Sequence, residues 1–457
     1  MGNVLLLISD EHNPRYATPY GHPFIQTPNM ERLAAMGTVY ENAYCPSPLC
    51  MPSRSAFMAG RWVHEIQTYS NCNAAMEDFT YPTYGQVLAE RGVHTVHIGK
   101  THVYRPGEEL GFSEMICPGD TAPPGDANHR RRPLAIRRGA AQRAARFGPR
   151  EDPWGVDPLL IDEAIEWLTG AALTIGKPWV LAVNLNKPHF PHYVTPELWE
   201  MYPHGENLPE HGPDCDSAQH PYAQDLRAHF ETAQFTEEQI RGLRRGYLGC
   251  VTFVDQQLGR LLDVLERTGQ LANTNVLYTS DHGEMLGKFG MWWKCALYED
   301  AVRVPLIVAG PDFDAPARVR TPVSLLDVQA SLFHIMGVER PADWRGMPLP
   351  EIAADDPERV VFAEYHGHGT RSGAYMVRQG PWKLIYYAEA PHQLFNLEED
   401  PEELHNLAEE NVDRRRRLTG QLRLICDPER ENRRAHAFEA KQFAHMASRG
   451  MYQEEES

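Results

Sequence analysis

The chain has 457 residues, of which 42% are hydrophobic and 23% charged, and its formal net charge is −18 at pH 7. This length allows a large core and a smaller second unit, and the acidic balance argues against nucleic acid as a partner. No apolar run reaches the length of a membrane helix, so we expect no membrane partner. The eight cysteines include no C-x-x-C pair and no signal peptide pattern precedes them. Both features favour reduced thiols and a cytoplasmic location.

Short apolar runs alternate with longer amphipathic segments along most of the chain. This pattern is typical of a sheet flanked by helices, so we predict an α/β fold with a large, mostly parallel mixed sheet. The expected strands are 4–9, 94–98, 180–185, 275–279 and 305–309, and the expected helices are 28–36, 84–91, 158–169, 247–268 and 324–336.

Two segments depart from this alternation. Residues 203–219 are rich in Pro, Gly, His and Asp and are interpreted as a long loop near the site. Residues 119–153 are interpreted as a solvated or subunit-contacting excursion, with a basic substrate-binding insert as the alternative. The arginines of this second segment are Arg130, Arg131, Arg132, Arg137, Arg138, Arg143, Arg146 and Arg150.

The sequence changes character after about residue 365. Short alternating runs at 374–378 and 382–387 predict two strands joined by a turn, and a charged helix follows. We therefore predict a catalytic domain over 1–365 and a small antiparallel α+β subdomain over 366–457. The polar tail from about residue 427 is interpreted as a subunit-packing arm or a frayed end, and it favours a homodimer or homotetramer.

The segment Cys50-Met51-Pro52-Ser53-Arg54 combines a nucleophile with a helix start. Pro52 suits the first turn of a helix, and Gly60 can end that helix in the left-handed conformation. Cys50 would then lie at a helix N-terminus, which favours an anion. Arg54 would add a forked donor for a tetrahedral oxyanion. On its own, this segment more often marks a buried structural cysteine before an ordinary helix.

Polar side chains follow four of the expected strands. In parallel sheets, ligands bind beyond the carboxyl ends of the strands, so we expect these side chains to converge. Carboxylates brought together there would repel unless a divalent cation lay between them. The residues are Asp10, Lys100 with His102, His189, and Asp281 with His282.

The cysteine segment and the block Ser280-Asp281-His282-Gly283-Glu284 together resemble the signatures of the sulfatase family, in the alkaline phosphatase superfamily. The resemblance implies an alkaline-phosphatase-like fold and hydrolysis of a small-molecule sulfate ester. It also implies that a formylglycine-generating enzyme oxidises Cys50 to formylglycine, whose aldehyde hydrate attacks the ester.

The same resemblance implies roles for individual residues. The implied cation is Ca²⁺, with Mn²⁺ as the alternative, because His282 stands where many members carry asparagine and an imidazole weakens the choice of Ca²⁺. Glu11 replaces a second aspartate and would point away from Asp10 unless the strand bends. The implied metal ligands are Asp10, Cys50, Asp281 and His282, with Glu11 as a further candidate; the implied catalytic residues are Cys50, Arg54, Lys100, His102, His189 and Lys294; and Asn71 matches a substrate-contacting position.

Two other functions remain open at this point. Phosphonate monoester or phosphodiester hydrolysis is the first, although relatives with that activity tend to carry hydroxyl side chains where this chain has Lys100 and His102. The second is a non-enzymatic anion-binding protein in which Cys50 stays a thiol. The sequence does not select among choline, aryl and sugar sulfates. Aromatic residues that would stack on a ring or a quaternary ammonium, or else pack in the core, are Trp62, Tyr69, Trp292 and Trp293.

Overall fold

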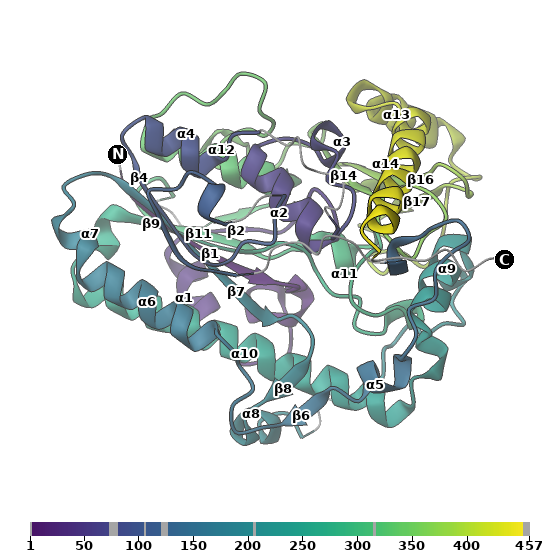
Figure 1. The fold of residues 1–457 in the computed structure, drawn as a ribbon, viewed down its shortest axis with the longest axis horizontal. Coiled ribbons are helices and arrows are strands. Elements are labelled where there is room, and N and C mark those ends of the chain that lie inside the picture. The colour runs from purple at the N-terminus through teal and green to yellow at the C-terminus, as the bar shows by residue number, and fades with distance from the viewer. Residues whose placement is uncertain are drawn as a thin grey trace.

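A computed structural model describes residues 2–72, 81–104, 107–119, 127–203, 207–313 and 317–450. It is built around an eight-stranded sheet with helices on both faces (Figure 1), which confirms the predicted α/β class. Five neighbouring strands are parallel, and β11 and β2 then run antiparallel to each other. The strand order is β12 (Ala317–Val319), β2 (Thr38–Tyr40), β11 (Leu306–Ala309), β9 (Thr274–Ser280), β1 (Asn3–Asp10), β7 (Trp179–Pro188), β4 (His94–Lys100) and β5 (Glu114–Gly119).

The central strand β1 is buried on both of its faces. Val4 and Leu6 pack into one hydrophobic core, while Leu5 and Leu7 pack into the other. A continuous apolar run is what a strand covered by helices on both sides requires. One face is covered by α1 (Pro28–Met36), α6 (Asp157–Thr169) and α10 (Glu237–Arg267), and the other by α2 (Cys50–Ala59), α4 (Tyr84–Glu90) and α12 (Leu325–Met336).

Helix α10 begins ten residues earlier than predicted. Thr236 caps it, since the Thr236 hydroxyl accepts from the Gln239 N–H and the Gln239 side chain accepts from the Thr236 N–H. The early part contains Gly242 and Gly246, which weaken helix propensity. A Cβ at Gly242 would lie 2.0 Å from the Phe147 ring, so the glycines allow other chain segments to cross the helix closely. The crossing strands are β6 (Phe147–Pro149) and β8 (His192–Val194).

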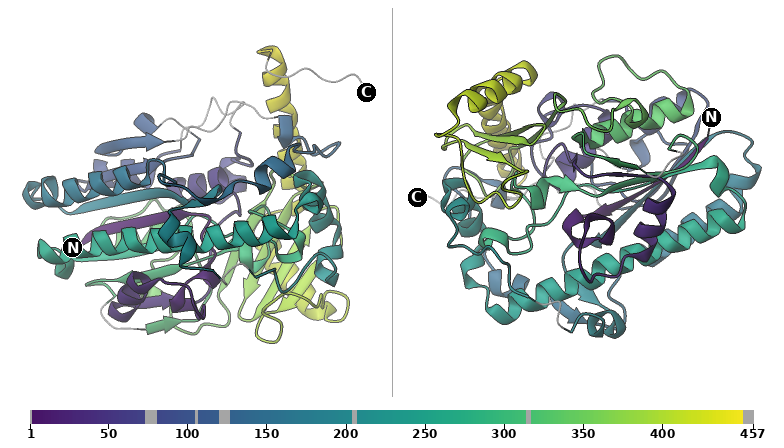
Figure 2. Two further views of the ribbon diagram at one scale, coloured as in Figure 1. Left: turned by 90° about the horizontal axis from the view of Figure 1, so that it is seen from below. Right: turned by 180° about the vertical axis from the view of Figure 1, so that it is seen from behind.

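A four-stranded antiparallel sheet forms the C-terminal part beside the large sheet (Figure 2). The predicted strands at 374–378 and 382–387 are confirmed as its central pair. Its first strand ends at residue 365 and so falls within the predicted first domain. The domain boundary itself stays a prediction. The elements are β14 (Val360–Tyr365), β15 (Ala374–Gln379), β16 (Trp382–Tyr387), β17 (Gln393–Asn396), α13 (Val412–Ile425) and α14 (Pro428–Ser448).

Residues 428–448 form a single helix, so the interpretation of this stretch as a frayed end is wrong, while its role as a subunit-packing arm stays a prediction. Asp427 caps helix α14 by accepting from the Arg430 N–H. One side of this helix is buried against the same chain through Ala435, Gln442 and Met446. The packing of this helix was not predicted because its apolar positions are few and many of its buried residues are polar. None of the described helices is long and apolar enough to cross a membrane.

Short elements connect these layers. A three-stranded sheet of β10, β3 and β13 joins the end of the large sheet to the segment before α12. The remaining elements are β3 (Ala43–Tyr44), β10 (Arg303–Val304), β13 (Val323–Ser324), α3 (Val63–Ile66), α5 (Ala140–Ala144), α7 (Ala171–Thr174), α8 (Pro196–Glu200), α9 (Pro221–Phe230) and α11 (Glu299–Val302).

A buried ion cluster fastens the C-terminal sheet to the large domain. Lys383 of β16 has no exposure, and its Nζ lies 2.8 Å from both Glu299 Oε1 and Glu403 Oε1. Burial by itself raises the pKa of Glu299, but Lys383 and Arg378 outweigh it and hold that pKa at about 2. Since this is below the ordinary value of 4.5, ionised Glu299 stabilises the fold above that pH. The contribution is lost as pH falls from about 4.5 toward 2.

We expect Lys383→Met to lower the free energy of unfolding by about 3–5 kcal/mol, because Glu403 stays buried without its cation and Glu299 keeps only Arg378 and Arg303. Chemical denaturation at neutral pH measures this loss. Arg416→Ala is the matched control, because Arg416 is 76% exposed beside an exposed Asp413 and its loss costs at most about 1 kcal/mol. Equal stability of Lys383→Met and wild type would contradict the role of this cluster.

Candidate active site

Cys50 is the first residue of α2, at the carboxyl edge of the large sheet. Pro52 lies in the first turn, and Gly60 ends the helix with φ 61°, so both local predictions are confirmed. All ten residues of the helix are buried, which holds its N-terminus rigidly. The Met51 N–H donates to the Asn71 side chain at 3.0 Å, so Asn71 positions the first turn of α2.

Two buried carboxylates meet beside Cys50. Asp10 ends β1, and Asp281 follows β9, which pairs with β1 in parallel. The Oδ2 atom of each carboxylate, which we call the outer oxygen, contacts a cation. Lys100 Nζ lies 2.7 Å from Asp10 Oδ2, and Arg54 Nε donates to Asp281 Oδ2 at 2.7 Å. Arg54 Nη2 also lies 3.4 Å from Asp10 Oδ2. The outer oxygens are thus neutralised by side chains of the protein.

The inner oxygens, Oδ1 of Asp10 and Oδ1 of Asp281, lie near a different set of side chains. His282 Nε2 lies 3.8 Å from Oδ1 of both Asp10 and Asp281, and 3.0 Å from Cys50 Sγ. The other ring nitrogen, His282 Nδ1, lies 3.0 Å from the Gly283 carbonyl, which orients Nε2 toward the carboxylates. One atom from each of Asp10, Cys50, Asp281 and His282 lies within 4.8 Å of the others. Two carboxylates and an imidazole converging in a buried space suit a divalent cation.

Glu11 lies on the same side as Asp10 because the backbone turns there. Its φ is 71°, a left-handed conformation that supplies the bend the sequence analysis required. The Glu11 carboxylate lies 3.3 Å from Lys294 Nζ and 3.4 Å from His189 Nε2. Burial raises the pKa of Glu11 to about 7 despite these cationic neighbours. Glu11 therefore links Lys294 and His189, and its role as a metal ligand stays a prediction.

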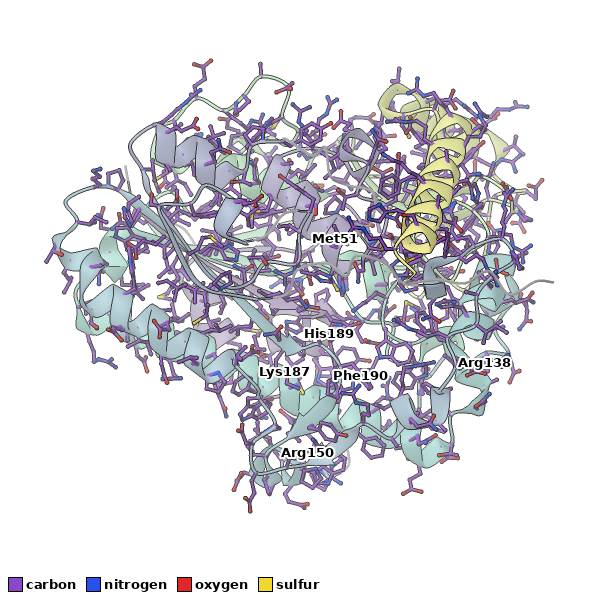
Figure 3. All side chains as sticks on the ribbon, viewed as in Figure 1. Met51, Arg138, Arg150, Lys187, His189 and Phe190 are labelled. Atoms are coloured by element: carbon purple, nitrogen blue, oxygen red, sulfur yellow. The ribbon has the colours of Figure 1, made fainter. Side chains whose placement is uncertain are left out.

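A pocket of about 420 Å³ opens above Cys50. Figure 3 labels two of its neighbours, His189 and Phe190, which lie just beyond β7. The pocket contains the side chains predicted to act on substrate, except Arg54. Its lining among the described residues holds no carboxylate. The lining residues are Leu49, Cys50, Asn71, Lys100, His102, His129, Arg137, Arg143, His189, Phe190, Phe230, Trp293, Lys294, Cys295 and His368.

Arg54 takes a place that differs from the sequence interpretation. We expected it to bind the oxyanion, but its donors are occupied by Asp281, Asp10 and the Asn184 side chain. With 5% exposure it lies beneath the pocket. Arg54 is therefore placed to position the two carboxylates, and of the predicted catalytic cations it is Lys100 and Lys294 that reach the pocket.

The surroundings of Cys50 favour a negatively charged group. Burial alone would raise the pKa of the Cys50 thiol, but Lys294 and His282 outweigh it and hold that pKa well below its usual range. His102 and His189 act in the same direction. The same positive field would stabilise an anion bound above residue 50.

Sequence reasoning missed several pocket residues. Arg137 and Arg143 come from the arginine-rich segment, for which a substrate-binding insert was only the alternative. His129 and His368 had no local signal, since single histidines are usually structural.

Of the four aromatic residues considered, Trp293 lines the pocket, whereas Trp62, Tyr69 and Trp292 pack elsewhere. No described residue of the predicted loop 203–219 lines it.

Comparison with known proteins now defines the class. The sequence profile of the family described as Sulfatase matches residues 2–338. A second profile, described as N-sulphoglucosamine sulphohydrolase, C-terminal, matches residues 287–424. The chain belongs to the sulfatase family and is a hydrolase of sulfate esters.

Curated relatives agree with this assignment. The chain is 33% identical to the choline-sulfatase of Rhizobium meliloti (strain 1021) over 429 residues, which cover 86% of this chain and 80% of that protein. It is 28% identical to arylsulfatase K of Danio rerio over 469 residues, which cover 96% of this chain and 87% of the relative.

Solved structures share the fold. One is a protein in complex with its substrate D-glucosamine-2-N,6-O-disulfate, with a TM-score of 0.75 at 21% identity, covering 94% of this chain and 99% of that one. Another is the phosphonate monoester hydrolase of Agrobacterium radiobacter, with a TM-score of 0.74 at 21% identity. The match covers 93% of this chain and 95% of that one. At this identity the likeness concerns the fold alone.

We expect Arg54→Ala to lower the free energy of unfolding by about 3–5 kcal/mol, because Asp10 and Asp281 lose a buried partner. Chemical denaturation with divalent ions removed by a chelator measures the effect. Arg61→Ala is the control, since Arg61 pairs with a largely exposed Asp343 and contributes at most about 1 kcal/mol. An Arg54→Ala protein as stable as Arg61→Ala would contradict the positioning role.

Proposed function

We propose that the chain hydrolyses sulfate monoesters with a formylglycine derived from Cys50 and one divalent cation held by Asp10, Asp281 and His282. The observation that carries this proposal is the position of Cys50 Sγ, 3.0 Å from His282 Nε2 and 3.9 Å from Asp10 Oδ1, at the floor of a cationic pocket. Glu11 is a further candidate ligand. The carboxylate oxygens of Asp10 and Asp281 favour Ca²⁺, and Mn²⁺ is the alternative because His282 contributes an imidazole nitrogen.

The modified side chain explains why a cysteine stands at this position. A thiol that attacked sulfur would leave a stable adduct, whereas a formylglycine hydrate can attack with one hydroxyl and release sulfate with the help of the other. The cation, when bound, would favour deprotonation of the attacking hydroxyl and offset negative charge. The formylglycine-generating enzyme is the partner that this proposal requires.

The other pocket residues are assigned to charge stabilisation and to proton transfer. Lys100 and Lys294 are placed to bind the nonbridging sulfate oxygens and stabilise the charge of the transition state. His189 is the candidate acid for the departing ester oxygen, and His102 is the candidate base for the second hydroxyl. The carbonyl of Phe190 lies 2.6 Å from His189 Nδ1, so a proton on Nδ1 would leave Nε2 to exchange protons with the ester.

The cytoplasmic location and the homodimer or homotetramer remain predictions. So does the alternative of phosphonate monoester or phosphodiester hydrolysis on the same framework. Lys100 and His102, in place of hydroxyl side chains, favour sulfate. A non-enzymatic anion-binding role requires Cys50 to stay a thiol, and mass spectrometry of the Cys50 peptide from the native source tests this, because the aldehyde is lighter than cysteine.

We expect Cys50→Ala to abolish hydrolysis of an aryl sulfate while the circular dichroism spectrum and melting temperature stay close to those of wild type. The wild-type enzyme should turn over the aryl sulfate faster than the matched aryl phosphonate. Retained activity in Cys50→Ala would exclude the formylglycine route. A preference for the phosphonate would replace the proposed function with its alternative.

We expect Asp10→Asn and Asp281→Asn to lose the bound cation, since removing even an outer-shell partner of a metal ligand typically lowers affinity by about 10–100-fold. Elemental analysis after dialysis against Ca²⁺ or Mn²⁺ gives the content of each ion per chain. Asp263→Asn is the control, because Asp263 lies in an exposed pair with Arg32. Unchanged metal content in both site variants would place the ion elsewhere.

A further inference from the structure

The position of His189, the candidate acid, depends on a short segment beyond β7. Residues 189–191 lie between the end of β7 and the start of β8, outside regular secondary structure. Within this segment, His189 Nε2 lies 3.4 Å from Glu11, and Phe190 lines the pocket together with His189 (Figure 3). Contacts other than strand pairing must therefore hold the segment in shape.

A buried carboxylate holds the start of this segment. Asp157, the first residue of α6, has no exposure. Its oxygens accept from the backbone N–H groups of Asn186 and Lys187 at 2.9 and 2.8 Å, and from the Asn186 side chain at 2.9 Å. The Asn186 carbonyl in turn accepts from the His189 N–H at 3.1 Å. One carboxylate thus links α6 to the backbone that carries His189.

Lys187 joins the two ends of the segment. Its Nζ donates to the Pro191 carbonyl at 2.8 Å, so the side chain spans the three residues between them, with His189 in the middle. The ammonium also lies 5.9 Å from the centre of the Trp154 ring. Lys187 is buried, with 5% exposure. The loop that presents His189 to the pocket is therefore closed by a hydrogen bond from a buried lysine.

A contribution to stability does not explain the charge of Lys187. Among the described residues, no carboxylate forms an ion pair with it, and Pro191 accepts the only hydrogen bond of its Nζ. Asp157 offsets part of the charge from a distance, since burial raises the pKa of Asp157 and Lys187 lowers it. A buried charge costs free energy unless it is paired, and an apolar side chain of similar volume is often as stable or more so. A methionine would therefore fill this space at no loss of stability.

We propose that Lys187 is a positioning residue for proton transfer, which holds the Pro191 carbonyl so that His189 reaches the departing ester oxygen. This inference rests on the proposed function, in which His189 is the candidate acid. A positioned acid contributes about 10²–10⁴-fold to a rate, and a displacement of about 1 Å costs about 100-fold. The contribution is greatest for a leaving group that cannot depart without a proton. Lys187 therefore matters most for esters with basic leaving groups.

Two sulfate esters that differ in their leaving group test the proposal. The anion released from 4-nitrophenyl sulfate is stable without a proton, whereas phenyl sulfate releases a more basic phenoxide. We expect Lys187→Met to lower kcat/KM about tenfold for phenyl sulfate and less than about twofold for 4-nitrophenyl sulfate, at a melting temperature close to that of wild type. Lys177→Met is the matched control, because Lys177 is exposed, also precedes a proline and lies just before β7. It should leave both rates unchanged.

A double-mutant cycle shows whether Lys187 acts through His189. His189→Ala removes the acid, so adding Lys187→Met to it should change phenyl sulfate hydrolysis less than about twofold. If Lys187→Met does not fold, Lys187→Gln takes its place, because the amide is too short to reach the Pro191 carbonyl. Unchanged hydrolysis of both esters, an equal loss for both, or a full further loss in the His189→Ala background would overturn the positioning role.

Hydrogen exchange of the segment separates this proposal from the proposed function. The N–H groups of Lys187 and His189 are hydrogen-bonded, so Lys187→Met, but not Lys177→Met, should raise exchange severalfold in the peptide that covers residues 186–192. If wild type hydrolyses neither ester but exchange rises in this way, the hydrolytic function fails and the hold of Lys187 on the segment stands. If wild type hydrolyses the esters but exchange stays unchanged, the positioning role fails and the function stands.

Discussion

The repulsion between two buried carboxylates is the constraint on which the site depends. Parallel pairing of β1 with β9 brings Asp10 and Asp281 to one point, where they have 0% and 2% exposure. Charges cannot be removed from water in this way unless they are paired. Arg54 and Lys100 neutralise the outer oxygens, and the inner oxygens are left facing one another. The helix that carries Cys50 is fixed against this point because Arg54 belongs to its second turn.

A second set of contacts builds the side of the pocket that holds Lys294. Glu284 is fully buried, and its Oε1 accepts from the N–H groups of Leu286 and Trp293 at 2.8 and 2.6 Å. The chain between them is folded tightly, and Trp293 has φ 63°. This geometry turns Lys294 toward Glu11, while its neighbour Trp293 faces the Arg143 guanidinium. One carboxylate thus sets the positions of a cation and of the aromatic ring beside it.

Sequence reasoning succeeded where a local pattern determines the structure. The apolar run of β1, Pro52 in the first turn and Gly60 at the helix end each carry their signal within a few residues. It failed where contacts with residues far away in the sequence determine the structure. The glycines of α10 are explained only by the strands that cross them, and the donors of Arg54 only by the strands that bring two aspartates to it. Arginine density in residues 119–153 gave no indication of which two side chains enter the pocket.

Arg131 ties the arginine-rich segment to the final helix. Its backbone N–H donates to Glu439 of α14 at 2.7 Å, and Gln442 on the same helix donates to the carbonyl of Cys72 at 2.8 Å. Helix α14 therefore braces one wall of the pocket, while Cys50 and its acidic neighbours are held by the central sheet. A change in the arginine-rich segment and its brace would reshape that wall and leave Cys50 and the two aspartates where the sheet puts them.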